Sequence, residues 1–312
     1  MILQTPIFRA IKEKYPGAYL HVLAGRQSSQ VIMNNPYVDK ISIFDKSPLK
    51  LLKLLARLAT EKFDYYIDPK DHDSTESYFL ARMIRAEKKI GYHSGGKVYD
   101  IIIPSHAENA GLYYTEIGFR ALECIGIYME EKIPMPELYP NPGSESYTAE
   151  FLGQGRGKPV ILINISAGKT ERNWKKEKWA EFIGLLNTGI YDIVISSAQS
   201  DKQSAEFIRS QQPAARLFYS RNMNDVISLV KASGVVISPD TSIVHVASAF
   251  DKPLIAMYNY SLKFYPKFRP LCTRQIVLLA RGGRLVRDIE IAEIAREIEN
   301  NDYFTILQIL IS

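Results

Sequence analysis

A polar turn that could bind a phosphate follows a short apolar segment late in the chain. Residues 235–237 are all apolar, the turn SPDTS occupies residues 238–242, and a helix is predicted to open there with His245 about one turn in. Unpaired backbone N–H groups and the helix dipole suit such a helix start to an anion. Asp240 or Thr241 could instead simply cap the helix. The position at the carboxyl end of a predicted parallel strand favours a ligand site.

A second group of small residues lies earlier in the same half of the chain. Ser166, Ala167 and Gly168 follow the predicted strand at residues 160–165. A loop of small residues lets a phosphate approach backbone amides closely. An ordinary strand-to-helix turn would have the same composition, so both interpretations stay open here.

Strands and helices alternate on both sides of a proline-rich stretch, residues 134–146, which we predict to be a linker. Such alternation is typical of parallel sheets covered by helices, and it predicts an α/β fold with two Rossmann-like domains facing a cleft, at 1–140 and 147–312. The predicted strands are 19–24, 40–44, 63–68, 89–92, 160–165, 192–196, 235–237 and 254–257, and the predicted helices are 6–14, 49–62, 76–85, 176–186, 203–211 and 224–231.

Composition narrows the class of protein. Of 312 residues, 46% are hydrophobic and 23% charged, as in globular proteins. Cys124 and Cys272 have no metal-binding spacing, and with no membrane-spanning run or secretory leader we expect a cytoplasmic protein. The net charge of +5 favours anionic partners such as nucleotides, phosphorylated glycolipids or a membrane surface. No motif indicates nucleic-acid binding.

Four blocks of the sequence, in order, resemble one known family. They are residues 1–16 (MILQTPIFRAIKEKYP), residues 63–92, residues 164–179 (NISAGKTERNWKKEKW), and the Asp-Thr-Ser turn with His245. The last is similar to an Asp-Thr/Ser-Gly-x-x-His signature. Together they resemble glycosyltransferase family 9, the bacterial lipopolysaccharide heptosyltransferases.

The resemblance implies a GT-B fold, with an N-terminal acceptor domain and a C-terminal nucleotide-sugar domain. It also implies inverting, metal-independent transfer of a heptose or related sugar, with ADP-heptose as the usual donor, to the core of lipopolysaccharide or lipooligosaccharide. No cofactor is implied beyond the nucleotide-sugar, and no metal. Such an enzyme would act in the cytoplasm, with a possible peripheral contact at the inner face of the inner membrane.

The resemblance also suggests roles for individual residues. Asp240 would bind hydroxyls of the donor sugar, and Arg172, two residues before Trp174, would stabilise the departing nucleotide diphosphate. His245 would bind phosphate, orient Asp240 or pack in its helix. The diphosphate itself would be held by Ser166, Ala167, Gly168, Lys175, Thr241 and Ser242, while Arg9 and Lys12 are candidates for acceptor binding, although both could be ordinary surface residues.

Two departures from the family pattern matter. The family's first strand and its Gly-Asp loop, which carries the general base, would precede Met1, so a sheet edge is expected to be exposed. Ser242 stands where the family has glycine, and its Cβ hinders close backbone approach. One alternative is therefore a catalytically impaired nucleotide-binding remnant that lacks the base. Another is a sugar-nucleotide epimerase, although the histidines of the first half, His21, His72, His93 and His106, lie in no recognised motif.

Two further patterns have competing interpretations. Lys50, Lys53 and Arg57 form a basic face on a leucine-rich helix, which suits either an anionic membrane or packing on a sheet, and we favour packing. Trp174 and Trp179 could stack on a base. Because Trp179 shares a helical face with Phe182, core packing is favoured.

Overall fold

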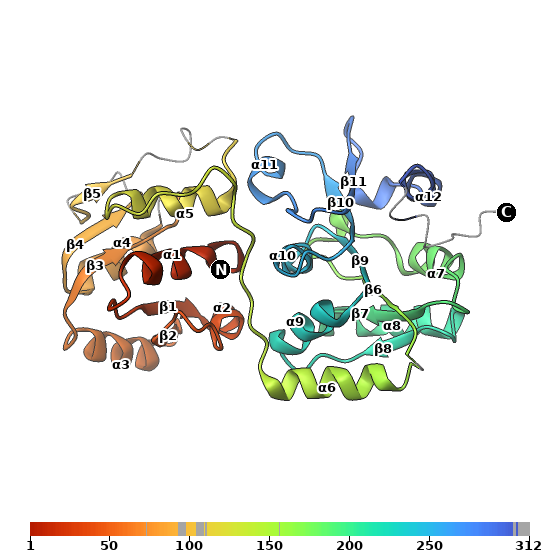
Figure 1. Cartoon of the computed structure of the whole chain (residues 1–312), viewed down its shortest axis with the longest axis horizontal. Helices are drawn as coiled ribbons and strands as arrows, with labels where there is room; N and C mark the ends of the chain where they lie inside the picture. The colour runs from red at the N-terminus through yellow and green to blue at the C-terminus, as the bar shows by residue number, and fades with distance from the viewer. Residues whose placement is uncertain are drawn as a thin grey trace. The chain divides into compact units, whose positions relative to one another are not determined.

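The computed structural model describes residues 1–72, 74–92, 98–103, 109, 111–155, 157–301 and 304. The chain divides into two compact units (Figure 1). The first comprises Met1–Glu137 with Leu262–Arg269, and the second comprises Leu138–Ser261 with Pro270–Ser312. Each unit is therefore built from two separate stretches of sequence. The predicted domains, 1–140 and 147–312, were each continuous and did not include the exchange of residues 262–269. His93 and His106 lie outside the described residues.

Six parallel strands form the sheet of the second unit, in the order β11-β10-β9-β6-β7-β8. The chain adds β7 and β8 on one side of β6, then returns so that β9 pairs with β6 on the other side. This reversal makes the β6–β9 boundary the topological switch point, where open α/β sheets bind ligands. The strands are β6 (Val160–Asn164), β7 (Asp192–Ser196), β8 (Arg216–Phe218), β9 (Val235–Pro239), β10 (Leu254–Asn259) and β11 (Gln275–Ala280).

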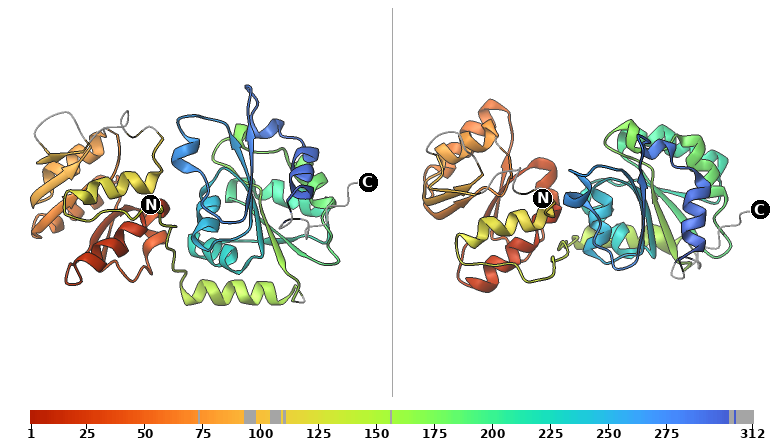
Figure 2. Two further views of the ribbon diagram at one scale, coloured as in Figure 1. Left: turned by 45° about the horizontal axis from the view of Figure 1, so that its top comes forward. Right: turned by 90° about the horizontal axis from the view of Figure 1, so that it is seen from above.

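Helices cover both faces of this sheet (Figure 2). Alternate residues of a strand point to opposite faces, so Ile161 and Ile163 pack with Trp179 and Phe182 while Leu162 faces the other way. All five are buried, which explains why β6 is apolar throughout. One face carries α7 (Lys176–Gly184), α8 (Lys202–Gln211) and α12 (Ile291–Glu299); the other carries α6 (Pro142–Gly153), α9 (Met223–Ala232) and α10 (Ser242–Ala249).

Both tryptophans belong to the core of the second unit. Trp179 is 1% exposed and Trp174 is 3% exposed, with ring centroids 4.8 Å apart. The Trp174 indole N–H donates to the carbonyl of Ile289 at 2.9 Å. The prediction of core packing for Trp179 is confirmed, and Trp174 is likewise not available to stack on a base.

The strands of the first unit form two parallel sheets instead of the single sheet that alternation suggests. One pairs β1 (His21–Gly25) with β2 (Lys40–Phe44), and the other joins β3 (Phe63–Ile67), β4 (Ala86–Gly91) and β5 (Ile101–Ile102). In the described part of the chain, one edge of β1 and one edge of β3 pair with no strand. Every open sheet has edges of this kind, so the exposure of an edge next to a preceding strand stays a prediction.

Helices hold the two small sheets in one unit. A buried cluster combines Leu54, Leu58 and Leu80 from two helices, and Ile84 directly after the second helix, with residues of both sheets, including Phe63. The helices are α1 (Pro6–Lys14), α2 (Arg26–Ile32), α3 (Pro48–Leu58), α4 (Thr75–Met83) and α5 (Tyr114–Glu123). The helix predicted at residues 49–62 corresponds to α3. It ends at Leu58, earlier than predicted, because the residues that follow form a turn into β3.

A segment from late in the sequence completes the first unit. Residues 262–269, which include α11 (Tyr265–Phe268), lie between β10 and β11 in the chain but belong to the first unit. There Lys267 forms an ion pair with Asp71, and both side chains are buried. The Phe268 ring lies 5.5 Å from that of Tyr114. This pairing joins residues almost 200 positions apart, so no local sequence pattern could indicate it.

The predicted linker at residues 134–146 is partly helical, which corrects the sequence analysis. Helix α6 begins at Pro142, and the Asn141 side chain caps it by accepting a hydrogen bond from the Ser144 amide at 2.7 Å. Proline at the first helical position and asparagine at the N-cap are both helix-start signals. The proline content of the stretch obscured them.

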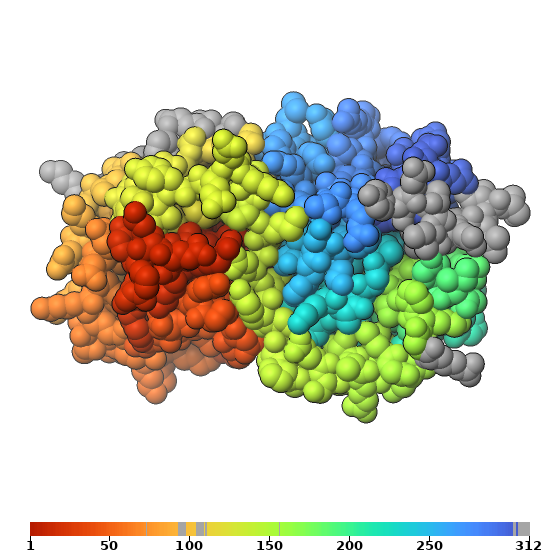
Figure 3. Space-filling model, in the orientation of Figure 1, coloured from red at the N-terminus to blue at the C-terminus, as the bar shows by residue number. Residues whose placement is uncertain are grey.

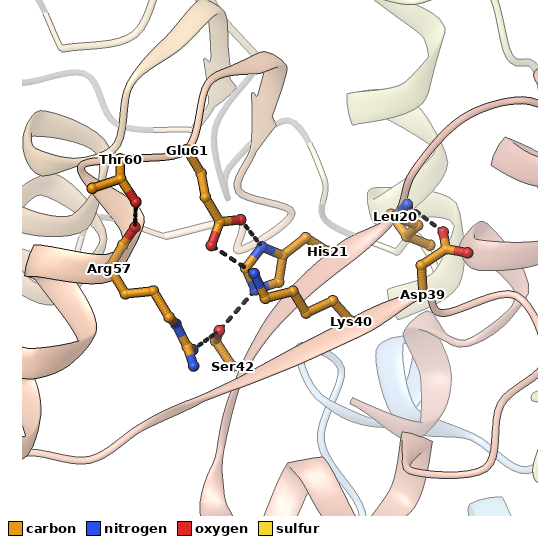
Figure 4. Close-up of polar contacts among 8 residues, drawn as sticks. All are labelled: Leu20, His21, Asp39, Lys40, Ser42, Arg57, Thr60 and Glu61. Carbon is orange, nitrogen blue, oxygen red and sulfur yellow. Dashed lines mark hydrogen bonds and ion pairs between the residues drawn. The ribbon is translucent and has the colours of Figure 1, made fainter.

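A buried histidine connects β1, β2 and the start of β3 in the first unit (Figure 4). The His21 Nδ1 lies 3.1 Å from a Glu61 carboxylate oxygen, and its Nε2 lies 2.7 Å from the Ser42 hydroxyl. Lys40 donates to the same carboxylate at 2.6 Å, and Arg57 donates to the Ser42 hydroxyl. A neutral imidazole satisfies every partner, because Nδ1–H donates to Glu61 and Nε2 accepts from Ser42.

Burial lowers the pKa of His21 below its ordinary value, although Glu61 opposes the shift. The folded protein then keeps His21 neutral at pH values where the unfolded chain already binds a proton. Stability should consequently fall as the pH drops below about 6.5, by up to about 1.4 kcal/mol per pH unit. Urea unfolding of the wild type and of His21→Gln over this range should show a weaker pH dependence in the variant.

His245 serves as an internal control, because it titrates in both proteins and cancels from the difference between them. Equal pH dependence of the two proteins would show that His21 is not held neutral by this network.

Candidate functional site

One buried amide joins the ends of β6 and β9 at the switch point of the second unit. Asn164, the last residue of β6, is 4% exposed. Its Nδ2 lies 3.0 Å from the Ser166 carbonyl oxygen, 3.0 Å from the Ser238 hydroxyl and 3.3 Å from the Thr241 hydroxyl. The loop after β6 and the loop after β9 are therefore fixed to the same side chain.

The loop after β6 is braced on both sides. The Ser166 hydroxyl accepts a hydrogen bond from the Ala198 amide, in the loop after β7, at 2.8 Å. Asn173 donates to the Ile165 carbonyl and accepts from the Trp179 indole at 3.1 Å. Between these braces Gly168 is exposed, and a Cβ placed on it would meet no atom within 4 Å. A ligand can therefore reach the backbone at this point of the loop.

The start of α10 faces the same edge of the sheet. Thr241 is the N-cap residue, and its hydroxyl accepts from the Ile243 amide at 3.2 Å. Thr241 rather than Asp240 caps the helix, which resolves the alternative left open by the sequence. Ser242 is exposed at the first helical position, and its backbone N–H has no hydrogen-bond partner among the described residues. That N–H and the helix dipole offer a site to an anion.

A cation from one loop meets a carboxylate from the other. The Arg172 Nη1 lies 3.1 Å from the Asp240 Oδ2, with side chains 36% and 22% exposed. Burial raises the pKa of the Asp240 carboxyl above its ordinary value, while Arg172 opposes that shift. Because the guanidinium remains partly exposed, it can also contact a ligand. The two residues singled out as catalytic from the sequence thus lie side by side.

Three other predicted residues of the second unit lie around the Arg172–Asp240 pair in different environments. His245 lies half-buried on α10, and burial lowers its pKa to about 4, so the imidazole is neutral near pH 7. Lys175 is exposed at the N-cap of α7 and makes no ion pair in the part of the chain that the structure describes. Ala167 lies half-buried between Ser166 and Gly168. Donor binding by these residues remains a prediction.

The two predicted acceptor-binding residues have structural partners within the first unit. Arg9 pairs with Glu137 at 2.7 Å and Lys12 pairs with Asp39 at 2.5 Å. Lys12 also donates to the Ala18 carbonyl at 2.5 Å. These contacts link α1 to Ala18, Asp39 and Glu137 of the same unit. Their role in acceptor binding stays a prediction.

Sequence reasoning missed the residues that support the site. The supporting residues are Asn164, Asn173 and Ser238. Their hydrogen bonds fix the two loops whose exposed residues a ligand could contact. A polar residue that ends an otherwise apolar buried strand, as Asn164 does, was the available signal, because buried polar groups need partners.

A model of glycosyltransferase family 9 (heptosyltransferase) matches residues 51–284 of the chain. Among curated proteins, the chain is 22% identical to lipopolysaccharide heptosyltransferase 3 of Escherichia coli over 83% of this chain and 80% of that protein. It is also 22% identical to lipopolysaccharide heptosyltransferase 2 of Escherichia coli strain K12 over 94% of this chain and 88% of that protein.

Solved structures give the same result for the fold. ADP-heptose lps heptosyltransferase II of E. coli matches with a TM-score of 0.75 and 19% identity, covering 96% of this chain and 94% of that one. A family 9 glycosyl transferase from Veillonella parvula matches with a TM-score of 0.80 and 16% identity, covering 96% and 92%. E. coli heptosyltransferase WaaC with ADP-2-deoxy-2-fluoro heptose matches with a TM-score of 0.73 and 16% identity, covering 96% and 95%. The predicted GT-B fold is confirmed.

Asn164→Asp tests whether one amide holds the site together. The substitution keeps the size of the side chain but replaces the NH2 group that donates to the Ser166 carbonyl by a charged oxygen, which that carbonyl oxygen repels. We expect a loss of about 2–4 kcal/mol in the free energy of unfolding, because buried acceptors lose their partner. Asn187→Asp is the matched control, since Asn187 uses its side-chain oxygen to accept from the Gly189 amide at 2.9 Å. Similar small losses in both variants, measured by urea unfolding, would contradict the assignment.

Proposed function

The chain belongs to glycosyltransferase family 9 and is a glycosyltransferase, and we propose that it moves a heptose or related sugar from ADP-heptose, or another nucleotide-sugar, to the lipopolysaccharide core. We propose inversion at the anomeric carbon and no metal ion in the reaction. The Arg172–Asp240 pair at the switch point carries the proposal. It sets a cation for the leaving group beside a carboxylate for the sugar.

The diphosphate of the donor would lie at the start of α10. There the Ser242 N–H is available and the helix dipole favours negative charge. On the other side of the switch point, Gly168 leaves the loop after β6 open to close approach. Phosphate oxygens could therefore contact backbone on both loops.

Serine in place of the family's glycine is compatible with this arrangement. Ser242 is exposed, so its Cβ and hydroxyl do not displace packed neighbours. The hydroxyl can donate to a phosphate oxygen beside its own backbone N–H. The substitution thus changes the contacts to the donor without closing the site.

Arg172 and Asp240 would then divide the work of transfer. The acceptor hydroxyl attacks the anomeric carbon, its proton passes to a base, and the bond from the sugar to the diphosphate breaks. Negative charge accumulates on the departing diphosphate, where the Arg172 guanidinium stabilises it. Asp240, which the diphosphate would repel, is suited to accept hydrogen bonds from sugar hydroxyls.

The sugar acceptor is inferred from the names of the relatives. Two curated relatives are named for lipopolysaccharide, so we propose a lipopolysaccharide or lipooligosaccharide core as acceptor, bound by the first unit. With such an acceptor, we propose that the enzyme acts in the cytoplasm, at the inner face of the inner membrane. No observation favours the alternative of a nucleotide-binding remnant that does not transfer sugar.

Thermal unfolding with ADP, UDP, GDP or CMP tests the donor assignment. At 100 times its dissociation constant, the matching nucleotide should stabilise the protein by about 2.7 kcal/mol. We expect ADP to raise the melting temperature most. Preference for UDP or GDP would keep a nucleotide-sugar enzyme but replace the donor, and no response to any nucleotide would contradict a donor site in the second unit.

Arg172→Gln should lower kcat for sugar transfer about 100- to 1000-fold, as expected for removal of one preorganised donor to a developing negative charge. Arg172→Lys should retain part of that activity, and the KM for the acceptor should change little in either variant. Lys169→Gln is the matched control, because Lys169 is a neighbouring exposed cation whose side chain is 65% exposed. Full activity of Arg172→Gln in a steady-state assay would refute the assigned role.

A further inference from the structure

The loop after β11, residues 281–290, is fixed to the rest of the second unit at both ends of the sheet edge. The Asn259 side chain, at the end of β10, accepts a hydrogen bond from the Val286 amide at 2.7 Å. Further along the loop, the Ile289 carbonyl accepts from the Trp174 indole at 2.9 Å. In the space-filling view, the loop stands at the upper surface of the second unit (Figure 3). It therefore combines a defined position with access to solvent.

This loop is a neighbour of the turn that carries Arg172. The turn η2 (Thr170–Arg172) lies next to β10 and next to η4 (Val286–Asp288), which belongs to the loop. Strand β10 lies between β11 and β9, the strand that leads to Asp240. Because neighbouring strands are about 4.8 Å apart, the ends of β10 and β11 lie about 5 Å and about 10 Å along the edge from the end of β9. A substrate at the Arg172–Asp240 pair is long enough to reach them.

Arg281, the first residue after β11, is an oriented cation without a partner of opposite charge. Its guanidinium lies over the ring of Tyr260, 4.9 Å from the ring centroid, and it makes no ion pair within the described residues. In contrast, Arg284 pairs with Glu293 and donates to the Asp288 carbonyl at 2.6 Å. Stacking on a ring fixes the plane of a guanidinium and leaves the N–H groups at its edge free. Arg281 can therefore donate to a ligand.

The other acidic residues of the loop do not neutralise Arg281. The Asp288 carboxylate accepts from the Leu285 amide at 2.8 Å. Glu290 pairs with Lys178 at 3.1 Å. Both carboxylates thus have partners of their own, and the positive charge of Arg281 remains available to an anion.

Two glycines directly after Arg281 add backbone donors. Gly282 and Gly283 have φ values of 66° and 82°, a region that favours glycine. Their backbone N–H groups have no hydrogen-bond partner in the part of the chain that the structure describes. A Cβ placed on either glycine would meet no atom within 4 Å, so the approach to these N–H groups is open. Successive free N–H groups in a turn are suited to binding an anion.

We propose that Tyr260, Arg281, Gly282 and Gly283, the Arg281 subsite, bind a phosphate group carried by the acceptor sugar. A guanidinium offers two parallel N–H donors to phosphate oxygens, and the glycine N–H groups offer more. Four oxygens in a tetrahedron can use donors that lie in different planes, which favours phosphate over a planar carboxylate. The proposal rests on the proposed function, because an acceptor sugar at the Arg172–Asp240 pair brings its phosphate to this edge. A free phosphate ion has the same chemistry, and the experiments below separate the two sources.

Binding of inorganic phosphate tests the Arg281 subsite without sugar transfer. With ADP saturating the donor site and ionic strength held constant, titration calorimetry of the wild type should show phosphate binding. Arg281→Gln should weaken it at least about tenfold, as expected for the loss of hydrogen bonds from a charged donor. Arg281→Lys should recover part of the affinity, because an ammonium group keeps the charge but lacks the planar pair of donors.

Arg287→Gln is the matched control for charge. Arg287 lies in the same loop, its side chain is 55% exposed, and it pairs with Asp288 at 3.8 Å. Its removal should leave the phosphate affinity unchanged, because a direct contact depends on position and not on net charge. An equal loss in Arg287→Gln and Arg281→Gln, or no phosphate binding by the wild type, would overturn the subsite.

Tyr260 acts as a positioning residue, because its ring orients Arg281. Tyr260→Phe keeps the ring and should retain the phosphate affinity, whereas Tyr260→Leu should lower it severalfold. Since Tyr260 is 40% exposed, neither change should prevent folding. Equal phosphate affinity of Tyr260→Leu and the wild type would remove Tyr260 from the subsite.

Sugar transfer to a phosphorylated acceptor, and to the same acceptor after phosphatase treatment, identifies the source of the phosphate. The wild type should have the higher kcat/KM with the phosphorylated acceptor. Arg281→Gln should reduce this preference about tenfold, through KM rather than kcat. Phosphate binding that depends on Arg281, together with the same acceptor preference in both proteins, would assign the subsite to a free phosphate ion and overturn its role in acceptor recognition.

The response to ADP separates this proposal from the proposed function. Arg281→Gln should keep the rise in melting temperature that ADP produces. If no nucleotide stabilised the wild type, phosphate binding that depends on Arg281 in the absence of nucleotide would leave the subsite standing and contradict the donor site. An ADP response without such phosphate binding would support the donor site and overturn the subsite.

Discussion

The geometry of the site depends on the need of one buried amide for partners. Asn164 ends a strand whose other residues are apolar, and it has little contact with water, so its N–H groups must find acceptors inside the protein. It finds them on Ser166, Ser238 and Thr241, and thereby fixes two loops that are more than seventy residues apart in sequence. Thr241 in turn caps α10, which orients the helix start towards the edge of the sheet.

The charges at this edge show why a cation and a carboxylate occur together. A guanidinium beside a helix start would be repelled by the positive end of the dipole, and Asp240 offsets that repulsion. Conversely, the buried side of Asp240 disfavours its charged form, and Arg172 stabilises it. The pair is therefore held together without a ligand, and an anion that bound at this edge would compete with Asp240 for Arg172. Preorganisation of this kind lowers the free energy needed to arrange the site during reaction.

The first unit uses long-range contacts because its sheets are short and separate. Two small sheets have few cross-strand hydrogen bonds between them, so stability must come from packing and ion pairs. The buried Lys267–Asp71 pair brings a segment from the second half of the sequence into this unit. Removing either partner would leave an uncompensated buried charge, a change that typically costs about 3–5 kcal/mol.

The sequence by itself determined most elements and the positions of the loops that carry chemistry. Short apolar runs and helical patterns predicted β2, β7 and α1 with their observed ends, and they placed Arg172 and Asp240 in loops after predicted strands. Such patterns suffice because burial on a strand or helix is a local periodicity. Even so, Pro142 and Asn141 marked a helix start that the proline content of the stretch hid.

Only the tertiary structure decided which of these residues meet. The ion pair of Arg172 with Asp240 follows from the pairing of β6 with β9, and strand order is not encoded in periodicity. The same holds for the Asn164 contacts, the return of residues 262–269, and the exposure of Leu49 and Leu52 on a helix that buries Leu54 and Leu58. Each is a relation between segments distant in sequence, and such relations are fixed by packing rather than by local propensity.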